Sequence, residues 1–270
     1  IYRKVNMEKK YQIIINFIEE IGISYKKYIG QKSLYLLECY LNGVKKRFDL
    51  EFDSSQIVKT KSQVLSSDLT GIGEFLQMFQ TWIGQKYFNS WQSWCNIIRF
   101  YTDNEEQAFE KFFQELKLFY ESDTIIESKK VCISDEICEY YGAGNIKMYG
   151  HNINSIIFKN VQYNKIFYQK LWKLLTMLKN APFLFIGEKS LSLTNIYIRG
   201  FIDAYNLGCE KGIVYDFFPG FEEWINQKAE LNLYRPWHKV ILFSCVTEGD
   251  AFDSLFNYLE EYTESKFEKL

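Results

Sequence analysis

Apolar side chains recur at spacings of three and four residues over most of this chain, which is the pattern of amphipathic α-helices. The clearest stripe runs from Phe109 to Phe119, and similar stripes cover residues 75–83 and 164–179. A further helix is expected over residues 7–20, and another after Ser33, a residue type that caps helix N-termini. The pattern predicts a mainly helical protein.

Residues 128–161 depart from this pattern. They mix β-branched and aromatic residues with glycines and asparagines, which is typical of short strands joined by turns. We expect strands near 129–133, 146–149 and 155–158, that is, a small β element near the middle of the chain.

The helical pattern also repeats. Ile-Gly-Gln-Lys-Ser-Leu at 29–34 returns as Ile-Gly-Glu-Lys-Ser-Leu at 186–191, an offset of 157 residues. At an offset of 142 residues, Phe79, Trp82 and Ile83 match Phe221, Trp224 and Ile225. At an offset of 143 residues, five positions match, namely Trp94, Ile98, Phe100, Ala108 and Phe109 with Trp237, Ile241, Phe243, Ala251 and Phe252. A period of about 150 residues is far longer than that of a solenoid, so one module is duplicated.

Most recurring residues are apolar or glycine, as a shared core requires. Gly43 and Gly200 recur inside the expected helices, where glycine weakens a helix slightly. We therefore expect a neighbouring helix or backbone to approach each of them closely.

The predicted fold class is mainly α, with two tandem copies of a helical module and a small β element between them. The predicted domains are a first repeat over 1–122 with an inserted loop near 51–73, a connecting region with short strands and a bridging helix over 123–181, and a second repeat over 182–270. Loops commonly carry function, so the insertion is a candidate for a contact specific to the first copy. A passive insertion is equally compatible with its composition.

Composition indicates a folded protein with substantial cores, since 47% of residues are apolar and 18% aromatic. The six cysteines form no tight framework and no hydrophobic leader is seen, so we expect reduced thiols in a cytoplasmic protein. No apolar run approaches the roughly 20 residues that a membrane span needs.

Charge is uneven although the net charge is only −2. Residues 182–270 hold 14 Asp and Glu against 8 Lys and Arg, which suits a basic partner but also an ordinary solvated surface. The basic runs at 45–47 and 129–130 are too short to indicate nucleic-acid binding.

No motif carries a reaction. The only histidines, His151 and His238, lack metal-ligand spacing, and Cys132 and Cys138 are six residues apart rather than in a C-x-x-C arrangement. Nucleophile elbows, P-loops and complete dinucleotide fingerprints are missing. We expect no catalytic residue, no metal and no cofactor.

The second copy resembles a group of small bacterial proteins. The resemblance lies in Phe-Ile-Gly-Glu-Lys-Ser-Leu at 185–191, Gly-Phe-Ile-Asp-Ala-Tyr at 200–205, Gly-Phe-x-x-Trp at 220–224, Trp-x-x-Val-Ile-Leu-Phe at 237–243 and Asp-Ala-Phe-x-x-Leu-Phe at 250–256. The first copy is similar more loosely, and residues 128–178 lie outside the resemblance. Members of this group are taken to be immunity proteins encoded beside polymorphic toxins.

The resemblance implies an immunity protein that binds a cognate toxin domain and covers its active site, rather than an enzyme. Partner contacts are predicted at Asp49, Glu51, Asp53, Glu248 and Asp250. Two alternatives stay open: an enzyme with a site in a cleft between the repeats, and a regulatory or scaffold protein with another partner.

Overall fold

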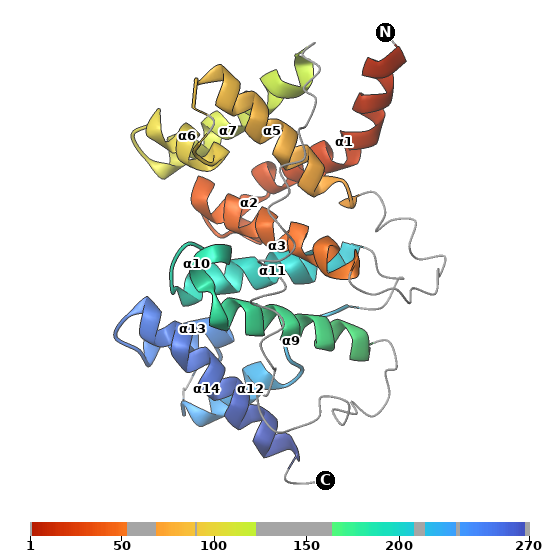
Figure 1. Ribbon diagram of the computed structural model, residues 1–270. Coiled ribbons are helices and arrows are strands. Elements are labelled where there is room, and N and C mark those ends of the chain that lie inside the picture. Colours follow the sequence, from red (N-terminus) through yellow and green to blue (C-terminus); the bar gives the residue numbers. More distant parts are fainter. Residues whose placement is uncertain are drawn as a thin grey trace. The chain divides into compact units, whose positions relative to one another are not determined.

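The computed structural model describes residues 2–52, 69–89, 91–122, 164–207, 214–230 and 233–267, and all regular elements in these ranges are helices (Figure 1). The predicted strands of 128–161 and most of the predicted inserted loop lie outside the described residues. In the ranges given, no helix combines the length and apolar content needed to cross a membrane.

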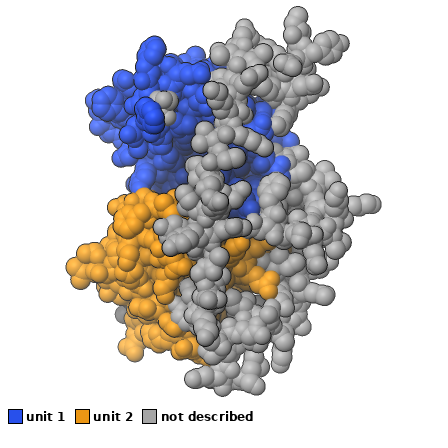
Figure 2. All heavy atoms as spheres, viewed as in Figure 1, with its two compact units in different colours: residues 1–131, 196–213 blue, residues 132–195, 214–270 orange. Residues whose placement is uncertain are grey.

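The chain divides into two compact units, coloured separately in Figure 2. Unit 1 comprises residues 1–131 and 196–213, and unit 2 comprises residues 132–195 and 214–270. The division falls within one helix, α11 (Leu191–Leu207), and so differs from the predicted domain boundaries.

In its described residues, unit 1 contains six helices before residue 131, and α11 from residue 196 onward. In order they are α1 (Tyr2–Ile23), α2 (Tyr25–Tyr28), α3 (Leu34–Phe52), α5 (Ile72–Lys86), α6 (Trp94–Phe100) and α7 (Glu105–Glu121). The helix expected over 7–20 is confirmed, and it extends further in both directions.

The predicted cap of α3 is also confirmed. Ser33 Oγ accepts a hydrogen bond of 3.3 Å from the backbone N–H of Leu36. The stripe that follows it, Leu34, Leu37, Leu41 and Val44, is fully buried.

Aromatic rings fill the core of unit 1 between α5, α6 and α7. Phe79 is fully buried, and its ring lies 5.4 Å from that of Phe112, 5.6 Å from Phe119 and 5.9 Å from Trp94, each edge to face. Such pairs add stability beyond the area that they bury, and they fix the short helix α6 against α5 and α7.

Helices α3 and α11 cross closely within unit 1. A Cβ added to Gly43 would lie 2.0 Å from the carbonyl oxygen of Tyr197, and one added to Gly200 would lie 2.2 Å from that of Tyr40. The close approach expected at both glycines is confirmed, because any larger residue would strike the backbone of the other helix.

Unit 2 is built from α9 (Asn164–Asn180), α10 (Pro182–Phe185), the start of α11, α12 (Phe221–Lys228), α13 (Trp237–Phe243) and α14 (Glu248–Phe267). The helix predicted over 164–179 is α9. Phe217 lies before α12, because that helix begins only after Gly220, which has a left-handed φ of 77°. Phe217 is nevertheless buried, with its ring 4.6 Å from that of Trp237.

Several contacts occur in both units at positions that match in sequence. Phe79 stacks on Trp82 at 6.2 Å, and Phe221 stacks on Trp224 at 5.9 Å. Lys32 pairs with Glu110 and Lys189 pairs with Asp253. Gly30 and Gly187 have left-handed φ values of 81° and 78°.

Candidate functional site

A pocket of about 750 Å³ opens in unit 1 beside α6. It is formed by α6 and by the loops that join this helix to α5 and α7. Amide side chains make up much of its lining, namely Asn89, Gln92, Asn96 and Asn104, together with the aromatic residues Phe100 and Tyr101. The pocket offers hydrogen-bonding groups next to apolar surface, a combination common in binding sites.

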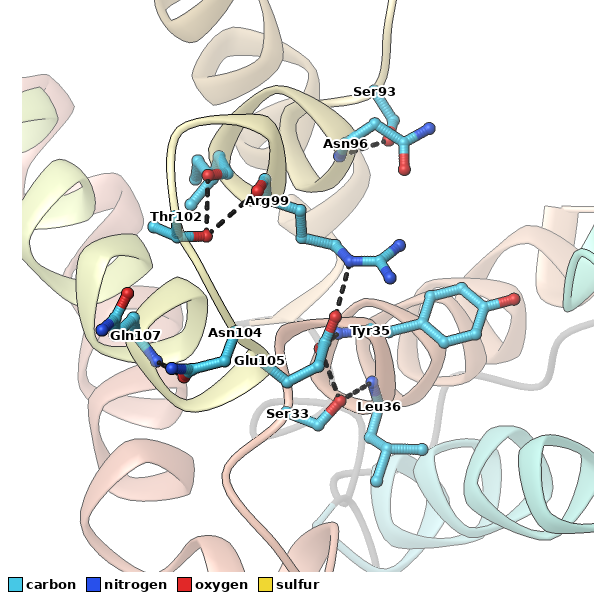
Figure 3. Close-up of polar contacts among 11 residues, drawn as sticks. Ser33, Tyr35, Leu36, Ser93, Asn96, Arg99, Thr102, Asn104, Glu105 and Gln107 are labelled. Carbon is cyan, nitrogen blue, oxygen red and sulfur yellow. Dashed lines mark hydrogen bonds and ion pairs between the residues drawn. The ribbon is translucent and has the colours of Figure 1, made fainter.

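Helix caps fix the loops around this pocket (Figure 3). Ser93 Oγ accepts a bond of 3.1 Å from the backbone N–H of Asn96 at the start of α6. Thr102 donates to the backbone carbonyls of Ile98 and Arg99 at its end. Asn104 Oδ1 accepts a hydrogen bond of 2.9 Å from the backbone N–H of Gln107 at the start of α7. The lining is therefore held by local bonds that the sequence itself specifies.

One carboxylate joins the pocket to the start of α3. Glu105 Oε2 accepts bonds from Ser33 Oγ at 2.8 Å and from the backbone N–H of Tyr35 at 3.1 Å, and Glu105 Oε1 pairs with Arg99 Nε at 2.6 Å (Figure 3). Desolvation by itself would raise the pKa of Glu105. The bonds from Ser33 and Tyr35 and the charge of Arg99 outweigh it and lower the pKa below its ordinary value.

Glu105 consequently stays ionised at neutral pH, with its oxygens engaged by donors. This arrangement positions α6 and α7 against α3, and it does not poise the carboxyl for proton transfer, which needs a pKa near the working pH.

A second polar pair, Glu38 and Cys95, lies on the adjoining faces of α3 and α6. Burial raises the pKa of both groups, although the bonds from Cys95 and Ser93 favour the ionised form of Glu38. Cys95 therefore remains a thiol, which is a poor nucleophile. In the described ranges no cluster of three His, Cys, Asp or Glu side chains could hold a metal ion.

Four large aromatic side chains near the pocket are exposed to solvent. Phe88 is 97% exposed, Trp91 95%, Phe100 81% and Tyr101 52%. Phe100 and Tyr101 line the pocket, and Phe88 and Trp91 each adjoin a lining residue in sequence. We call these four residues the aromatic rim. Exposed apolar side chains beside polar groups are typical of protein-binding surfaces.

Phe100 corrects one expectation from the sequence. It recurs as Phe243, and recurring apolar residues were expected in the core, yet both side chains are 81% exposed. Helix geometry explains the difference. At 100° per residue, Phe100 lies on the opposite face of α6 from Trp94 and Ile98, which are buried. The same helical count could have singled out Phe100 in the sequence, where the rim and pocket were missed.

The predicted partner-binding residues are distributed over both units. Asp49 is exposed on α3 and pairs with Lys45 at 2.7 Å. Glu51 lies in the last turn of α3, but its side chain is outside the described part, as is the whole of Asp53. Asp49 is not among the residues that line the pocket.

Glu248 and Asp250 share the first turn of α14 in unit 2. Glu248 Oε2 accepts hydrogen bonds from Ser190 Oγ at 3.0 Å and from the backbone N–H of Ser192 at 2.9 Å. These two bonds match those that Glu105 accepts from Ser33 and Tyr35. Burial opposes ionisation of Glu248, but the bonds from Ser192 and Ser190 lower its pKa overall. Asp250 is exposed, and it forms no ion pair with any residue that the structure describes.

Comparisons of the chain with models of protein families, with curated proteins and with solved structures gave no match.

Proposed function

We propose that this chain is an immunity protein that binds a cognate bacterial toxin domain and covers its active site. The observation that carries the proposal is the aromatic rim around the pocket in unit 1. Leaving four large aromatic residues exposed invites aggregation, a cost that a binding role offsets. The described groups of the pocket serve recognition better than proton transfer, because Glu105 is held in its ionised form.

Binding would use the rim as its anchor. Tyr and Trp are enriched among residues that dominate binding energy, because they bury large areas while losing few rotatable bonds. The amides Asn89, Gln92 and Asn96 would satisfy polar groups of the partner at the edge of the buried area. We place this encounter in the cytoplasm, where the toxin would act.

We also propose that the chain consists of two tandem copies of one helical module. The support is the recurrence of detailed contacts at matching positions. Ser33 with Glu105 and Ser190 with Glu248 are the clearest, because each links the start of one helix to the first turn of another. On this view α1 and α2 correspond to α9 and α10, so the second copy begins near Asn164 rather than at 182.

The test begins with the gene immediately upstream of the gene for this chain, which the proposal expects to encode a secreted protein with a C-terminal toxin domain. We expect co-expression to protect cells from that domain, and the purified pair to bind with nanomolar affinity. A Trp91→Ala, Phe100→Ala double variant should weaken binding by about a hundredfold. Leu118→Ala, at a half-exposed position on α7, is the matched control. Absence of protection, or unchanged binding by the double variant, would overturn the proposal.

A further inference from the structure

Two asparagines that line the pocket are oriented by backbone donors. Asn104 Oδ1 accepts a hydrogen bond of 2.9 Å from the backbone N–H of Gln107, and Asn89 Oδ1 accepts one of 3.3 Å from the backbone N–H of Trp91. A backbone N–H can only donate, so the atom that faces it in each amide is the oxygen. The NH₂ group of each side chain donates to no residue that the structure describes. Both asparagines therefore bring unused hydrogen-bond donors to the pocket.

Arg99 brings further donors to the same lining. Its Nε is held by Glu105 Oε1 at 2.6 Å, and its guanidinium lies 5.4 Å from the centre of the Tyr35 ring (Figure 3). Within the described part of the chain, the two terminal nitrogens of Arg99 have no hydrogen-bond partner. The two contacts fix the plane of the guanidinium, so little side-chain entropy is lost when its terminal nitrogens bind a ligand.

The charged groups around the pocket favour a neutral ligand. Arg99 is paired with Glu105, and Lys32 is paired with two carboxylates of α7. Asp103 is exposed and forms no ion pair with a described residue. An anionic group would be repelled by Asp103 and Glu105, whereas a cationic group would meet Arg99 and the positive ends of the amide NH₂ groups. A neutral group that both accepts and donates hydrogen bonds avoids both costs.

Unit 2 shows that the helix cap does not require an amide. At an offset of 143 residues, Asn104 matches Thr247. Thr247 Oγ1 accepts a hydrogen bond of 3.0 Å from the backbone N–H of Asp250 in the first turn of α14, as Asn104 Oδ1 does in α7. A cap needs only this acceptor. The NH₂ group of Asn104 is therefore an addition that the fold does not use.

Arg99 is likewise specific to unit 1. It matches Leu242 in unit 2, and a leucine cannot pair with a carboxylate. There Ser192 Oγ donates to Glu248 Oε1 at 2.6 Å, whereas Tyr35, which lies beside Arg99, occupies the matching position in unit 1. The carboxylate at the start of the last helix is thus held in two different ways, and the way used in unit 1 places a guanidinium at the pocket.

We propose that these donors bind the main chain of a loop of the partner. The NH₂ groups of Asn89 and Asn104 and the terminal nitrogens of Arg99 donate to carbonyl oxygens of that loop. Asp103 accepts from one of its N–H groups. The peptide unit is the neutral group in every protein that offers both an acceptor and a donor, and surface loops leave many of these groups facing solvent. The inference rests on the proposed function, since it names the part of the toxin domain that enters the pocket.

The test removes one donor at a time and keeps the fold. Asn104→Asp and Asn89→Asp each replace the NH₂ group by an oxygen of nearly the same size and keep the oxygen that accepts from the backbone. Aspartate caps a helix as well as asparagine does, so thermal unfolding of both variants should match that of the wild-type chain. Binding of the C-terminal domain encoded by the upstream gene should weaken about tenfold in each variant, because a carbonyl oxygen of the loop would face an oxygen instead of a donor.

Asn16→Asp is the matched control. Asn16 is exposed on α1, its Oδ1 accepts from Gln12 Nε2 at 2.8 Å, and it is not among the residues that line the pocket. The variant adds the same negative charge and keeps its acceptor, so it should bind as the wild-type chain does. Measuring all three variants at low and at high salt separates a lost hydrogen bond, which salt changes little, from an interaction between charges, which salt screens.

The expected result is a tenfold loss from both pocket variants that persists at high salt, with unchanged binding by Asn16→Asp. A loss that disappears at high salt would show that the partner presents an anion to the pocket, and tighter binding would show that it presents a cation. Either result, or wild-type affinity in both pocket variants, would overturn the inference. The proposed function would still stand if the wild-type chain binds the domain and the Trp91→Ala, Phe100→Ala double variant binds it more weakly. If the wild-type chain does not bind the domain, both proposals are wrong.

Discussion

Gly43 and Gly200 face each other's helices at the crossing of α3 and α11. Each glycine lies against a backbone carbonyl of the opposite helix, that of Tyr197 for Gly43 and that of Tyr40 for Gly200. The two residues also match in sequence at the offset of 157 that joins their helices. A backbone cannot rotate aside as a side chain can, so both positions require glycine.

Alanine at either glycine should therefore destabilise the protein. We expect Gly43→Ala and Gly200→Ala each to lower the free energy of unfolding by about 3 kcal/mol, at the upper end of typical overpacking costs. Gly249→Ala in α14 is the control, because the nearest atoms to its added Cβ lie at 3.8 Å. That variant should be neutral or slightly more stable. Urea unfolding measures the stability of all three variants. If Gly43→Ala were as stable as the wild-type chain, the close crossing of α3 and α11 would be contradicted.

Asp203 lies near this crossing and accepts a hydrogen bond of 2.9 Å from Tyr40 Oη. Burial raises the pKa of Asp203, partly offset by the bond from Tyr40 and the charge of Arg199. A carboxyl with a raised pKa binds protons more readily when folded, so its ionisation lowers stability as pH rises through the folded-state pKa.

Asp203→Asn should remove the loss of stability that accompanies ionisation of Asp203, and it should retain an acceptor for the hydroxyl of Tyr40. We expect stability at pH 7 to be unchanged or raised by about 1 kcal/mol, with a flatter pH dependence above pH 4. Asp203→Leu should instead cost about 1–3 kcal/mol, because the hydroxyl of Tyr40 loses its acceptor in the interior. Unfolding in urea between pH 4 and pH 8 distinguishes the two variants. Equal destabilisation by both would show that ionised Asp203 is needed.

Glu105 and Glu248 should show the opposite pH dependence. Their folded-state pKa values are lowered, so the stability they contribute is present above the unfolded pKa of about 4.3 and is lost as pH falls through the folded pKa. Glu105→Gln and Glu248→Gln should each cost about 1 kcal/mol at pH 7, a figure reduced for their partial exposure. The cost should shrink below pH 4. Similar losses from both variants are expected because the two contacts match. A loss that is equal at pH 7 and pH 3 would contradict the assignment.

Trp91 and Trp94 provide a matched pair three residues apart. Trp94 is 6% exposed and its ring contacts Phe79 and Phe112, whereas Trp91 is 95% exposed. Trp94→Ala should cost about 3–5 kcal/mol of unfolding free energy, and Trp91→Ala less than about 0.5 kcal/mol. Thermal or urea unfolding checks both. A large loss from Trp91→Ala would mean that the aromatic rim supports the fold rather than a partner.

The sequence by itself determined the helices and most of their buried faces. The spacing of Leu34, Leu37, Leu41 and Val44 and the cap at Ser33 are local features, because each involves residues within about one or two turns. The recurring glycines also predicted a close approach correctly, since glycine inside a helix is otherwise unfavourable.

Only the tertiary structure decided which partners those residues meet and, apart from Phe100, which apolar residues remain exposed. The aromatic rim could not be read from composition, because exposure depends on the helices that pack around a residue rather than on its type. Glu105 shows the same limit: its place in the first turn of α7 was readable, but its bonds to Ser33, Tyr35 and Arg99 join segments up to 72 residues apart. The sequence thus determines the local periods and caps, whereas long-range packing decides the pocket, the pKa values and the surface left for a partner.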